Sequence, residues 1–250
     1  SLRILDLDTD ARLLAGGLRR LRPAPTLPGE LYDFRIGPAY RRRLDNGWIA
    51  GGNLVLGSAS DRPFASAAEI TVDANAFLRI PDGPRNAWLL LLNYASNREF
   101  LPHVPIPGVA YLYEPDDRFR AVLGAPFSAI RYEPLDGLTF EGSYFVPRSL
   151  KAELGYRLAP PLKLYAGYQW ANDRFLRAAR DDDDHRLFYY EQRVLAGLRW
   201  DIDRNVWLDL GGGFAFDRFF AEARDYGDRG RRRTEVSDGP LLKLELGLRL

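Results

Sequence analysis

Charged residues recur at every second position in several segments of the chain, and this spacing decides what chemistry they can do together. Within residues 148–159, Lys151, Glu153 and Arg157 alternate with apolar residues, and Lys163 keeps the same phase after the next turn. Because successive side chains of a β-strand point to opposite faces, these charged groups share one face. Charges of both signs on neighbouring strands predict cross-strand ion pairs, and around a water-filled path they would act on passing ions.

The phase of each predicted strand assigns further charged residues to this polar face. The basic members are Arg35, Arg41, Arg43, Arg79, Lys151, Arg157, Lys163, Arg193, Arg199, Lys243 and Arg249. The acidic members are Asp33, Glu69, Asp73, Glu141, Glu153, Glu191, Asp209, Asp217 and Glu245. Two interpretations are open: a polar pore with a mild anion preference, because arginine clusters line anion pathways, or an ion-paired and blocked interior that holds the wall together.

The element that positions these charges is a strand with one aliphatic face. Residues 241–250 read LLKLELGLRL, with leucine at every even position and Lys243, Glu245 and Arg249 on the other face. Strict alternation predicts a β-strand. Similar segments recur along the chain at the length that a tilted membrane-crossing strand needs, about 9 to 11 residues. We therefore predict an all-β fold, an antiparallel up-and-down transmembrane β-barrel of about 12 strands that takes up residues 1–250 as a single domain. A soluble β-sandwich or lipocalin-like barrel, which has similar strand spacing, is the alternative fold.

The connections between the predicted strands alternate between short and long, which is typical of membrane barrels. The predicted strands span residues 31–44, 48–60, 69–80, 87–97, 119–133, 138–146, 148–159, 162–178, 187–200, 206–223 and 240–250, and the opening segment 2–21 supplies a twelfth. The sequence Asp45-Asn46-Gly47 is a strong hairpin signal. An even number of strands places both termini and the short turns on the periplasmic side.

Tryptophan and tyrosine collect at the two membrane interfaces, and the tryptophans provide an independent check. Trp48, Trp88 and Trp200 adjoin short turns and fall on the apolar face of their strands, where they can form a girdle. Trp207 also adjoins a short turn, but it falls on the polar face. We expect Trp207 to pack inside the rim.

Composition agrees with a barrel and excludes several other classes. The charged content of 28% and the mean hydropathy of -0.30 are expected when alternation splits the hydrophobicity between two faces. Cysteine is absent, which excludes a disulfide framework and a thiolate metal site. The net charge of +1 gives no support for a nucleic-acid partner. The chain starts at Ser1 and has no methionine, as expected of a mature product after signal-peptide removal or of an edited sequence.

The closing strand and the order of connections resemble those of bacterial outer-membrane β-barrels, over nearly the whole chain. The last strand is similar to the assembly signal of that class, although it ends in Leu250 where an aromatic residue is usual. The resemblance implies a place in the bacterial outer membrane, with membrane lipid and lipopolysaccharide as partners and no cofactor. It implies a passive, porin-like channel for small polar solutes. A non-conducting structural or surface-interaction barrel is the alternative.

An enzymatic function is not expected. A phospholipase in this membrane would need a serine and a histidine, oriented by a third polar group, at the lipid-facing surface. The two histidines are His103, in a Pro-rich connection, and His185, after an acidic run. Neither falls on a strand face beside a serine, and we interpret both as exposed loop residues.

Three connecting segments have unusual compositions. Residues 181–184 are four aspartates, whose carboxylates suit Ca2+ but lack the glycine and ligand spacing of a calcium loop, so a solvated acidic tip is favoured and no metal site is predicted. Residues 229–233 read RGRRR and either contact lipopolysaccharide phosphates or form a merely soluble loop. Residues 101–117 are too apolar for an ordinary loop, and we expect them to fold inward or to pack on the rim.

Overall fold

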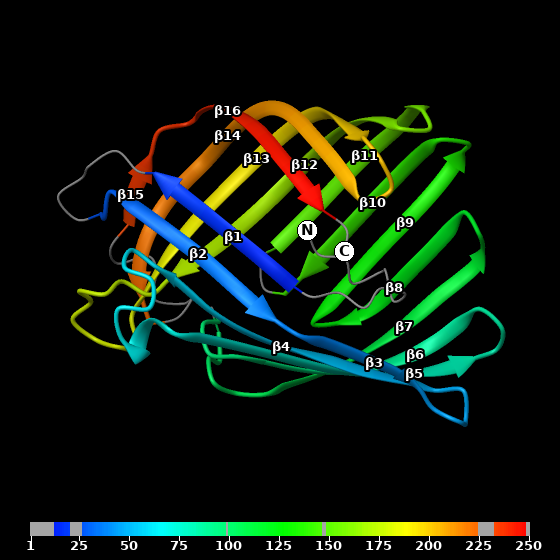
Figure 1. Ribbon diagram of the computed structural model, residues 1–250, viewed down its shortest axis with the longest axis horizontal. Helices are drawn as coiled ribbons and strands as arrows, with labels where there is room; N and C mark the ends of the chain where they lie inside the picture. Colours follow the sequence, from blue (N-terminus) through cyan, green and yellow to red (C-terminus); the bar gives the residue numbers. More distant parts are fainter. Residues whose placement is uncertain (1–12, 21–26, 99, 147–148, 225–232, 249–250) are drawn as a thin grey trace. The chain divides into compact units, whose positions relative to one another are not determined.

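The computed structural model describes residues 13–20, 27–98, 100–146, 149–224 and 233–248 of the 250-residue chain. Over these ranges it forms sixteen β-strands and one short 3-10 helix (Figure 1). The strands form one sheet in which sequence neighbours hydrogen-bond to one another, antiparallel and up-and-down, as predicted. None of the described helical residues forms a helix long and apolar enough to span a membrane.

The elements of the first part of the chain are β1 (Leu13–Arg20), β2 (Glu30–Gly37), β3 (Ala39–Arg43), β4 (Ile49–Ser60), η1 (Ala67–Glu69), β5 (Thr71–Asp82), β6 (Asn86–Ala95), β7 (Ile106–Asp116) and β8 (Phe119–Ala125). The remaining strands are β9 (Phe127–Leu135), β10 (Leu138–Phe145), β11 (Ser149–Ala159), β12 (Leu162–Phe175), β13 (Arg186–Asp201), β14 (Val206–Ala223), β15 (Arg233–Val236) and β16 (Gly239–Leu248).

The sixteen strands occupy fourteen positions in the sheet order. Strands β2 and β3 both pair with β4, and strands β15 and β16 both pair with β14, so each of these pairs acts as one interrupted strand. Within the described residues, β1 pairs with β2 alone and β16 with β14 alone. The strand path is therefore open between these two ends.

The prediction of about twelve strands is wrong by two positions, and both lie between residues 98 and 135. The sequence predicts a connection over residues 98–118, but β7 forms there, with its prolines close to the strand ends where a missing N–H does least harm. The sequence also predicts one strand over residues 119–133, but Pro126 separates β8 from β9 because it cannot donate to the ladder. The opening segment contributes β1, as expected.

The short turns are built by local backbone and side-chain groups. In the predicted hairpin after β3, Gly47 has a φ of +80°, which glycine adopts without strain, and its N–H donates to the Leu44 carbonyl at 2.9 Å. In the turn before β8, Asp116 accepts hydrogen bonds from the backbone N–H groups of Arg118 and Phe119. These acceptors satisfy backbone groups that the hairpin would otherwise leave unpaired.

By its internal contacts the chain divides into two compact units. The first unit comprises Ser1–Ile80, Leu90–Pro107 and Arg174–Arg186. The second unit comprises Pro81–Leu89, Gly108–Asp173 and Leu187–Leu250.

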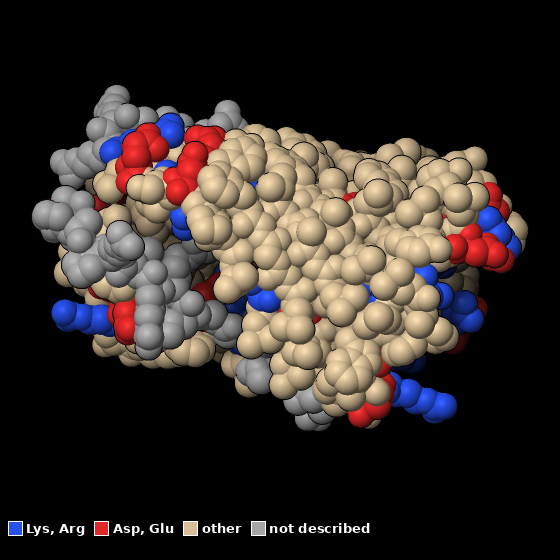
Figure 2. Space-filling view, turned by 90° about the horizontal axis from the view of Figure 1, so that it is seen from above, with Lys and Arg blue, Asp and Glu red and all other residues tan. Residues whose placement is uncertain are grey.

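On strands β11, β14 and β16 of the second unit, burial is inverted relative to that of a water-soluble sheet. Leu154 and Leu244 are 51% and 74% exposed, whereas Glu153 and Asp209 on the opposite face are 6% and 0% exposed. Figure 2 shows a broad stretch of uncharged side chains, with most of the visible charged groups gathered toward its two ends. Because charged residues are almost never fully buried in soluble proteins unless paired, this face needs the ion pairs described below.

The first unit has the same outward apolar pattern. Ile36 on β2 and Leu54 and Leu56 on β4 are exposed, whereas Val55, between the two leucines, is 4% exposed. The middle of β4 therefore has an outward aliphatic face, as the sequence predicts. Ser58 and Ser60 share the phase of the leucines but are fully buried at the end of the strand.

Three of these four tryptophans lie on the faces that their phases indicate. Trp88 and Trp200 are among the exposed large hydrophobic residues, and the Trp88 ring meets the Tyr111 ring edge-on at 4.9 Å. Trp207 lies on the charged side, where the Arg199 guanidinium stands 5.4 Å from its ring centroid. Trp48 is partly buried.

A backbone irregularity at Asp217 reverses the two faces of β14. Its φ is +48°, a left-handed value that departs from the extended backbone of a regular strand. Before it, the odd-numbered Asp209 lies on the charged face. After it, the even-numbered Arg218 takes that side and pairs with Glu191. The prediction that Asp217 lies on the polar face is therefore wrong, since Asp217 accepts a hydrogen bond from Gln192, which alternates onto the outward face of β13.

Candidate functional site

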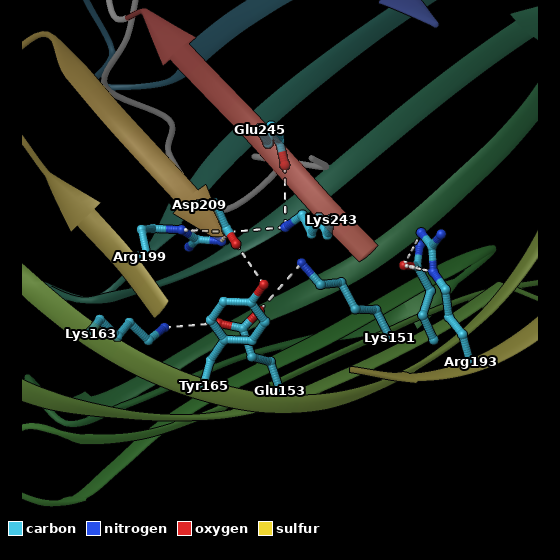
Figure 3. Close-up of polar contacts among 10 residues, drawn as sticks. Lys151, Glu153, Lys163, Tyr165, Arg193, Arg199, Asp209, Lys243 and Glu245 are labelled. Atoms are coloured by element: carbon cyan, nitrogen blue, oxygen red, sulfur yellow. Dashed lines mark hydrogen bonds and ion pairs between the residues drawn. The ribbon is translucent and has the colours of Figure 1, made fainter. Parts of the chain in front are cut away.

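The densest group of charges lies on the polar face of β11 to β16, in the second unit (Figure 3). Asp209 on β14 is fully buried and accepts hydrogen bonds from three side chains. The donors are the Tyr165 hydroxyl on β12 at 2.5 Å, Arg199 Nη2 on β13 at 2.8 Å and Lys243 Nζ on β16 at 2.9 Å. We refer to these four residues as the Asp209 cluster.

Strand register explains why the cluster needs its lysine. Asp209 and Glu245 lie directly opposite each other in the β14–β16 ladder, where like charges repel. Lys243 Nζ lies 2.9 Å from Asp209 Oδ2 and 3.2 Å from Glu245 Oε2, so one cation offsets both carboxylates. Glycine makes room for the Tyr165 ring, because a Cβ at Gly197 would come 2.5 Å from its hydroxyl oxygen.

Glu153 forms a second centre on the same face. It is nearly buried and pairs with Lys163 at 2.9 Å and with Lys151 at 3.7 Å. Its direct cross-strand neighbour is Glu141, which has its own partner in Arg131 at 3.9 Å. The negative charge of each glutamate is therefore balanced by a lysine or arginine, because the residue directly opposite it is also a glutamate.

Glu191 forms the third centre, toward the other end of β13. Arg193 and Arg218 lie 3.4 and 3.1 Å from its oxygens, and the Tyr189 hydroxyl donates to it. Arg193 also donates two hydrogen bonds to Oε1 of Gln169 on β12. Removing one partner of such a buried pair typically costs about 3 to 5 kcal/mol, so the paired charges stabilise this wall.

The polar face of the first unit is different, because uncharged carboxamides cross it. Asn53 on β4, Asn75 on β5 and Asn93 on β6 form a continuous chain of side-chain hydrogen bonds, which we call the carboxamide row. Asn75 Nδ2 donates to Asn53 Oδ1 at 2.8 Å, and Asn93 Nδ2 donates to Asn75 Oδ1. Both bonds are exposed.

Arg98, in the connection after β6, ends the carboxamide row. Its Nη2 donates to Asn93 Oδ1 at 2.6 Å and to the Asn93 carbonyl at 3.0 Å. Arg98 is itself buried, and this burial, followed by the nearby charge of Arg174, lowers the pKa of its guanidinium from the usual value. Asp73 on β5 acts in the opposite direction on that guanidinium.

The connection between β12 and β13 is tied to distant strands of the first unit. We call Arg174–Arg186 the strap. The Leu176 N–H donates to the Ala59 carbonyl at 2.7 Å, and the Ala178 N–H donates to Asp61 Oδ1 at 2.8 Å. Arg180 pairs with Glu69 at 3.3 Å, with both side chains only 3% exposed. Seven strands separate β4 from β12 in the sheet order, so these contacts bring remote parts of the sequence together.

The structure brings most of the sequence-predicted residues into ion pairs. Besides the centres around Asp209, Glu153 and Glu191, Arg35 pairs with Asp33 at 2.8 Å. The positive charge of Arg35 also acts on the carboxylate of Asp73. Arg41 is partly buried on β3 opposite Gly51. Arg43, Arg79 and Arg157 form no ion pair with any of the residues that the structure describes.

Several predicted features lie elsewhere. Glu69 is wrongly predicted on a strand, because it belongs to η1, where it forms a capping box with Ser66. Arg249 and residues 229–232 lie outside the described residues. In the acidic run, Asp183 pairs with Arg180 at 3.1 Å. His103 lies in the loop after β6, where its Nδ1 is 3.5 Å from the Tyr94 hydroxyl. Across the described ranges, no group of three or more Asp, Glu, His or Cys residues could hold a metal ion.

Sequence reasoning missed the carboxamide row, although a signal was present. All three asparagines fall on the polar phase of the predicted strands 48–60, 69–80 and 87–97. Their shared phase was the signal, since it places three uncharged polar side chains on neighbouring strands of one face.

No protein-family model, no curated protein sequence and no solved structure matches this chain. The two polar faces and the outward apolar face are therefore the basis for inferring a function.

Proposed function

We propose that this chain is a transmembrane β-barrel of a bacterial outer membrane, and that it forms a porin-like channel for small polar solutes. The observation that carries this proposal is the inverted burial of the strands, with Leu154 and Leu244 outward and Asp209 and Glu153 buried. Exposed aliphatic patches of this extent promote association in water, whereas the hydrocarbon of a bilayer solvates them.

A bilayer requires a closed sheet, because no water is present to hydrogen-bond the edge strands. The two open ends of the strand path are β1 and the β15/β16 strand, so the proposal requires these two to pair, which would give a closed sheet of fourteen positions. Fourteen is an even number, as in bacterial single-chain barrels, and it lies between filled barrels of about 8 strands and open ones of about 16 to 18. Outer-membrane lipid and lipopolysaccharide are then the surroundings of the apolar face.

The charges that govern selectivity are those that ion pairing leaves available. Arg43, Arg79 and Arg157 each lie within three residues of the end of their strand, at the short-turn end of β3, β5 and β11. They support the mild anion preference, because the sign of charges lining a path sets its selectivity. The paired charges of the Asp209 cluster contribute to the wall instead.

The strap is a long connection that is held against a strand of the first unit. The Leu176 N–H donates to the Ala59 carbonyl on β4, so this connection does not extend freely from the strand ends. Its buried Arg180–Glu69 pair favours a fixed position over a swinging one.

A non-conducting barrel is the second candidate, and the Asp209 cluster favours it. A fully buried carboxylate with three donors fills space on the polar face of the second unit. Conductance separates the two candidates, since both predict the same fold in detergent and lipid.

The test is single-channel recording from the purified full chain in planar bilayers. We expect discrete conductance steps and a reversal potential displaced toward anions in a salt gradient. The triple variant Arg43→Glu, Arg79→Glu, Arg157→Glu should move the reversal potential toward cation selectivity, and the matching triple lysine variant should not. If a folded, membrane-inserted chain shows no steps, the non-conducting barrel is the correct interpretation.

A further inference from the structure

The carboxamide row has a direction. Arg98 donates to Asn93, Asn93 donates to Asn75, and Asn75 donates to Asn53. In such a chain each hydrogen bond polarises the next, so the last amide becomes a better donor than an isolated one. Asn53 on β4 is that last amide.

The row has hydrogen-bonding capacity left over. A carboxamide has two N–H donors and an oxygen with two lone pairs. The bonds along the row use one donor of Asn75 and one of Asn93, and one lone pair on each of the three oxygens. Each amide therefore retains at least one donor and one acceptor, and because both inter-amide bonds are exposed, these can reach a solute. A hydroxyl group, which donates and accepts, matches this pattern.

An aromatic ring lies beside the row. Phe77 is two residues after Asn75 on β5, hence on the same face, and it lies opposite Gly51 in the β4–β5 ladder. A Cβ at Gly51 would come 2.5 Å from the Phe77 ring, so the ring lies over the bare glycine backbone. An apolar surface next to a few convergent polar groups is the usual composition of a small-molecule site.

Two of the charged side chains near the row, Arg98 and Arg35, are already engaged, which favours hydroxyl groups over anions at that end of the row, whereas Arg79 lies toward the other end, two residues after Phe77 on β5. Arg98 is committed to Asn93 and to the Val104 carbonyl, and Arg35 is paired with Asp33. Neighbouring strands are about 4.8 Å apart, so three amides span roughly 10 Å, about the length of one or two sugar rings.

We propose that Asn53, Asn75, Asn93 and the Phe77 ring form a subsite for neutral solutes with several adjacent hydroxyl groups, the class of saccharides and polyols. This inference rests on the proposed function, because it requires a polar face that solutes can reach. It extends that function by naming the class of solute that the first unit retains.

The experiment is saturation-transfer NMR on the full chain folded in detergent, with maltose as the probe and glucose 6-phosphate as its charged comparator. We expect a signal from maltose, and about tenfold weaker binding after Asn75→Leu, which removes the central amide at similar volume. Asn205→Leu, at an exposed carboxamide in the turn before β14, is the matched control and should leave binding unchanged.

A second variant guards against misfolding. Asn75→Asp keeps the shape and still accepts from Asn93, but it loses both donors, so it should fold normally and still weaken maltose binding. Unchanged binding in this folded variant overturns the inference, as does the absence of any maltose signal. If glucose 6-phosphate binds as tightly as maltose and loses as much affinity in the Asn75 variants, the subsite does not prefer neutral solutes.

Conductance is recorded in parallel on the same variants. If the chain conducts ions but does not bind maltose, the saccharide subsite is wrong and the proposed channel function is retained. Binding without conductance overturns the channel and leaves the row as a saccharide site of a non-conducting barrel.

Discussion

The polar faces of the two units are built from the same alternation, yet they differ in what they leave available. In the second unit, Asp209, Glu153 and Glu191 are buried and each is bound by two or more partners. In the first unit, Asn53 and Asn75 are joined by an exposed bond between neutral groups. Charges on a crowded face neutralise one another and become structural, whereas neutral amides keep free donors and acceptors.

Glycine use follows the same division. In the second unit, the space above Gly197 and Gly211 is taken by Tyr165, whose hydroxyl reaches Asp209. In the first unit, the space above Gly51 is taken by the Phe77 ring, which has no polar group to donate. One ring completes a charged cluster and the other leaves an apolar surface beside the carboxamide row.

The largest expected effect is at the Asp209 cluster. Asp209→Ala leaves Arg199 and Lys243 without their buried acceptor, and we expect the free energy of unfolding in lipid to fall by about 3 to 5 kcal/mol. Urea titration of the vesicle-inserted protein measures the change. A loss below about 1 kcal/mol would show that this wall does not depend on its ion pairs and would remove the contrast between the units.

A charge on the outward face should be costly in both units alike. Leu54→Arg on β4 and Leu154→Arg on β11 each place a cation near the middle of an outward strand face. Each should reduce the free energy of unfolding by about 2 to 4 kcal/mol in a bilayer. The same urea titration applies, with Arg157→Lys as a control on the polar face. Tolerance of arginine at Leu54 alone would mean that the outward face of the first unit does not meet lipid.

The hydroxyl of Tyr165 should contribute an intermediate amount. Tyr165→Phe removes one donor to Asp209 while leaving Arg199 and Lys243 in place. Hydrogen bonds to charged groups typically contribute about 1.5 to 3 kcal/mol, and we expect a loss in that range. The midpoint of heat-modifiable gel migration should drop with it. If the midpoint temperature of the variant equals that of the unchanged chain, Arg199 and Lys243 alone stabilise Asp209.

The smallest effect is expected in the carboxamide row. Asn53→Ala removes one neutral, exposed hydrogen bond and should cost about 1 kcal/mol or less. If its cost in the urea titration approaches that of Asp209→Ala, the row is a structural element and the two faces are equivalent.

The alternation of polar and apolar residues was sufficient to predict most residues of the polar face, because side chains at every second position stay on one side of a regular strand. Glu153 and Asp209 were found in this way. The left-handed residue Asp217 was not foreseen, because nothing in the alternation before it marks the reversal. Strand β7 was missed because the prolines at 107 and 115 resemble loop punctuation. The choice of partners, such as Lys163 for Glu153, depends on register and strand twist, which periodicity alone does not give.

The strap also has a consequence for the order of folding. Nearly all pairings in the sheet join strands that are neighbours in sequence, and such hairpins close short loops with little entropy cost. The strap bonds to residues more than 100 positions earlier, as Ala178 does to Asp61 and Arg180 to Glu69. Its contacts form only after β4 and β12 are both in place. Protection of residues 176–185 from a protease added during refolding therefore reports that assembly has progressed across the intervening strands.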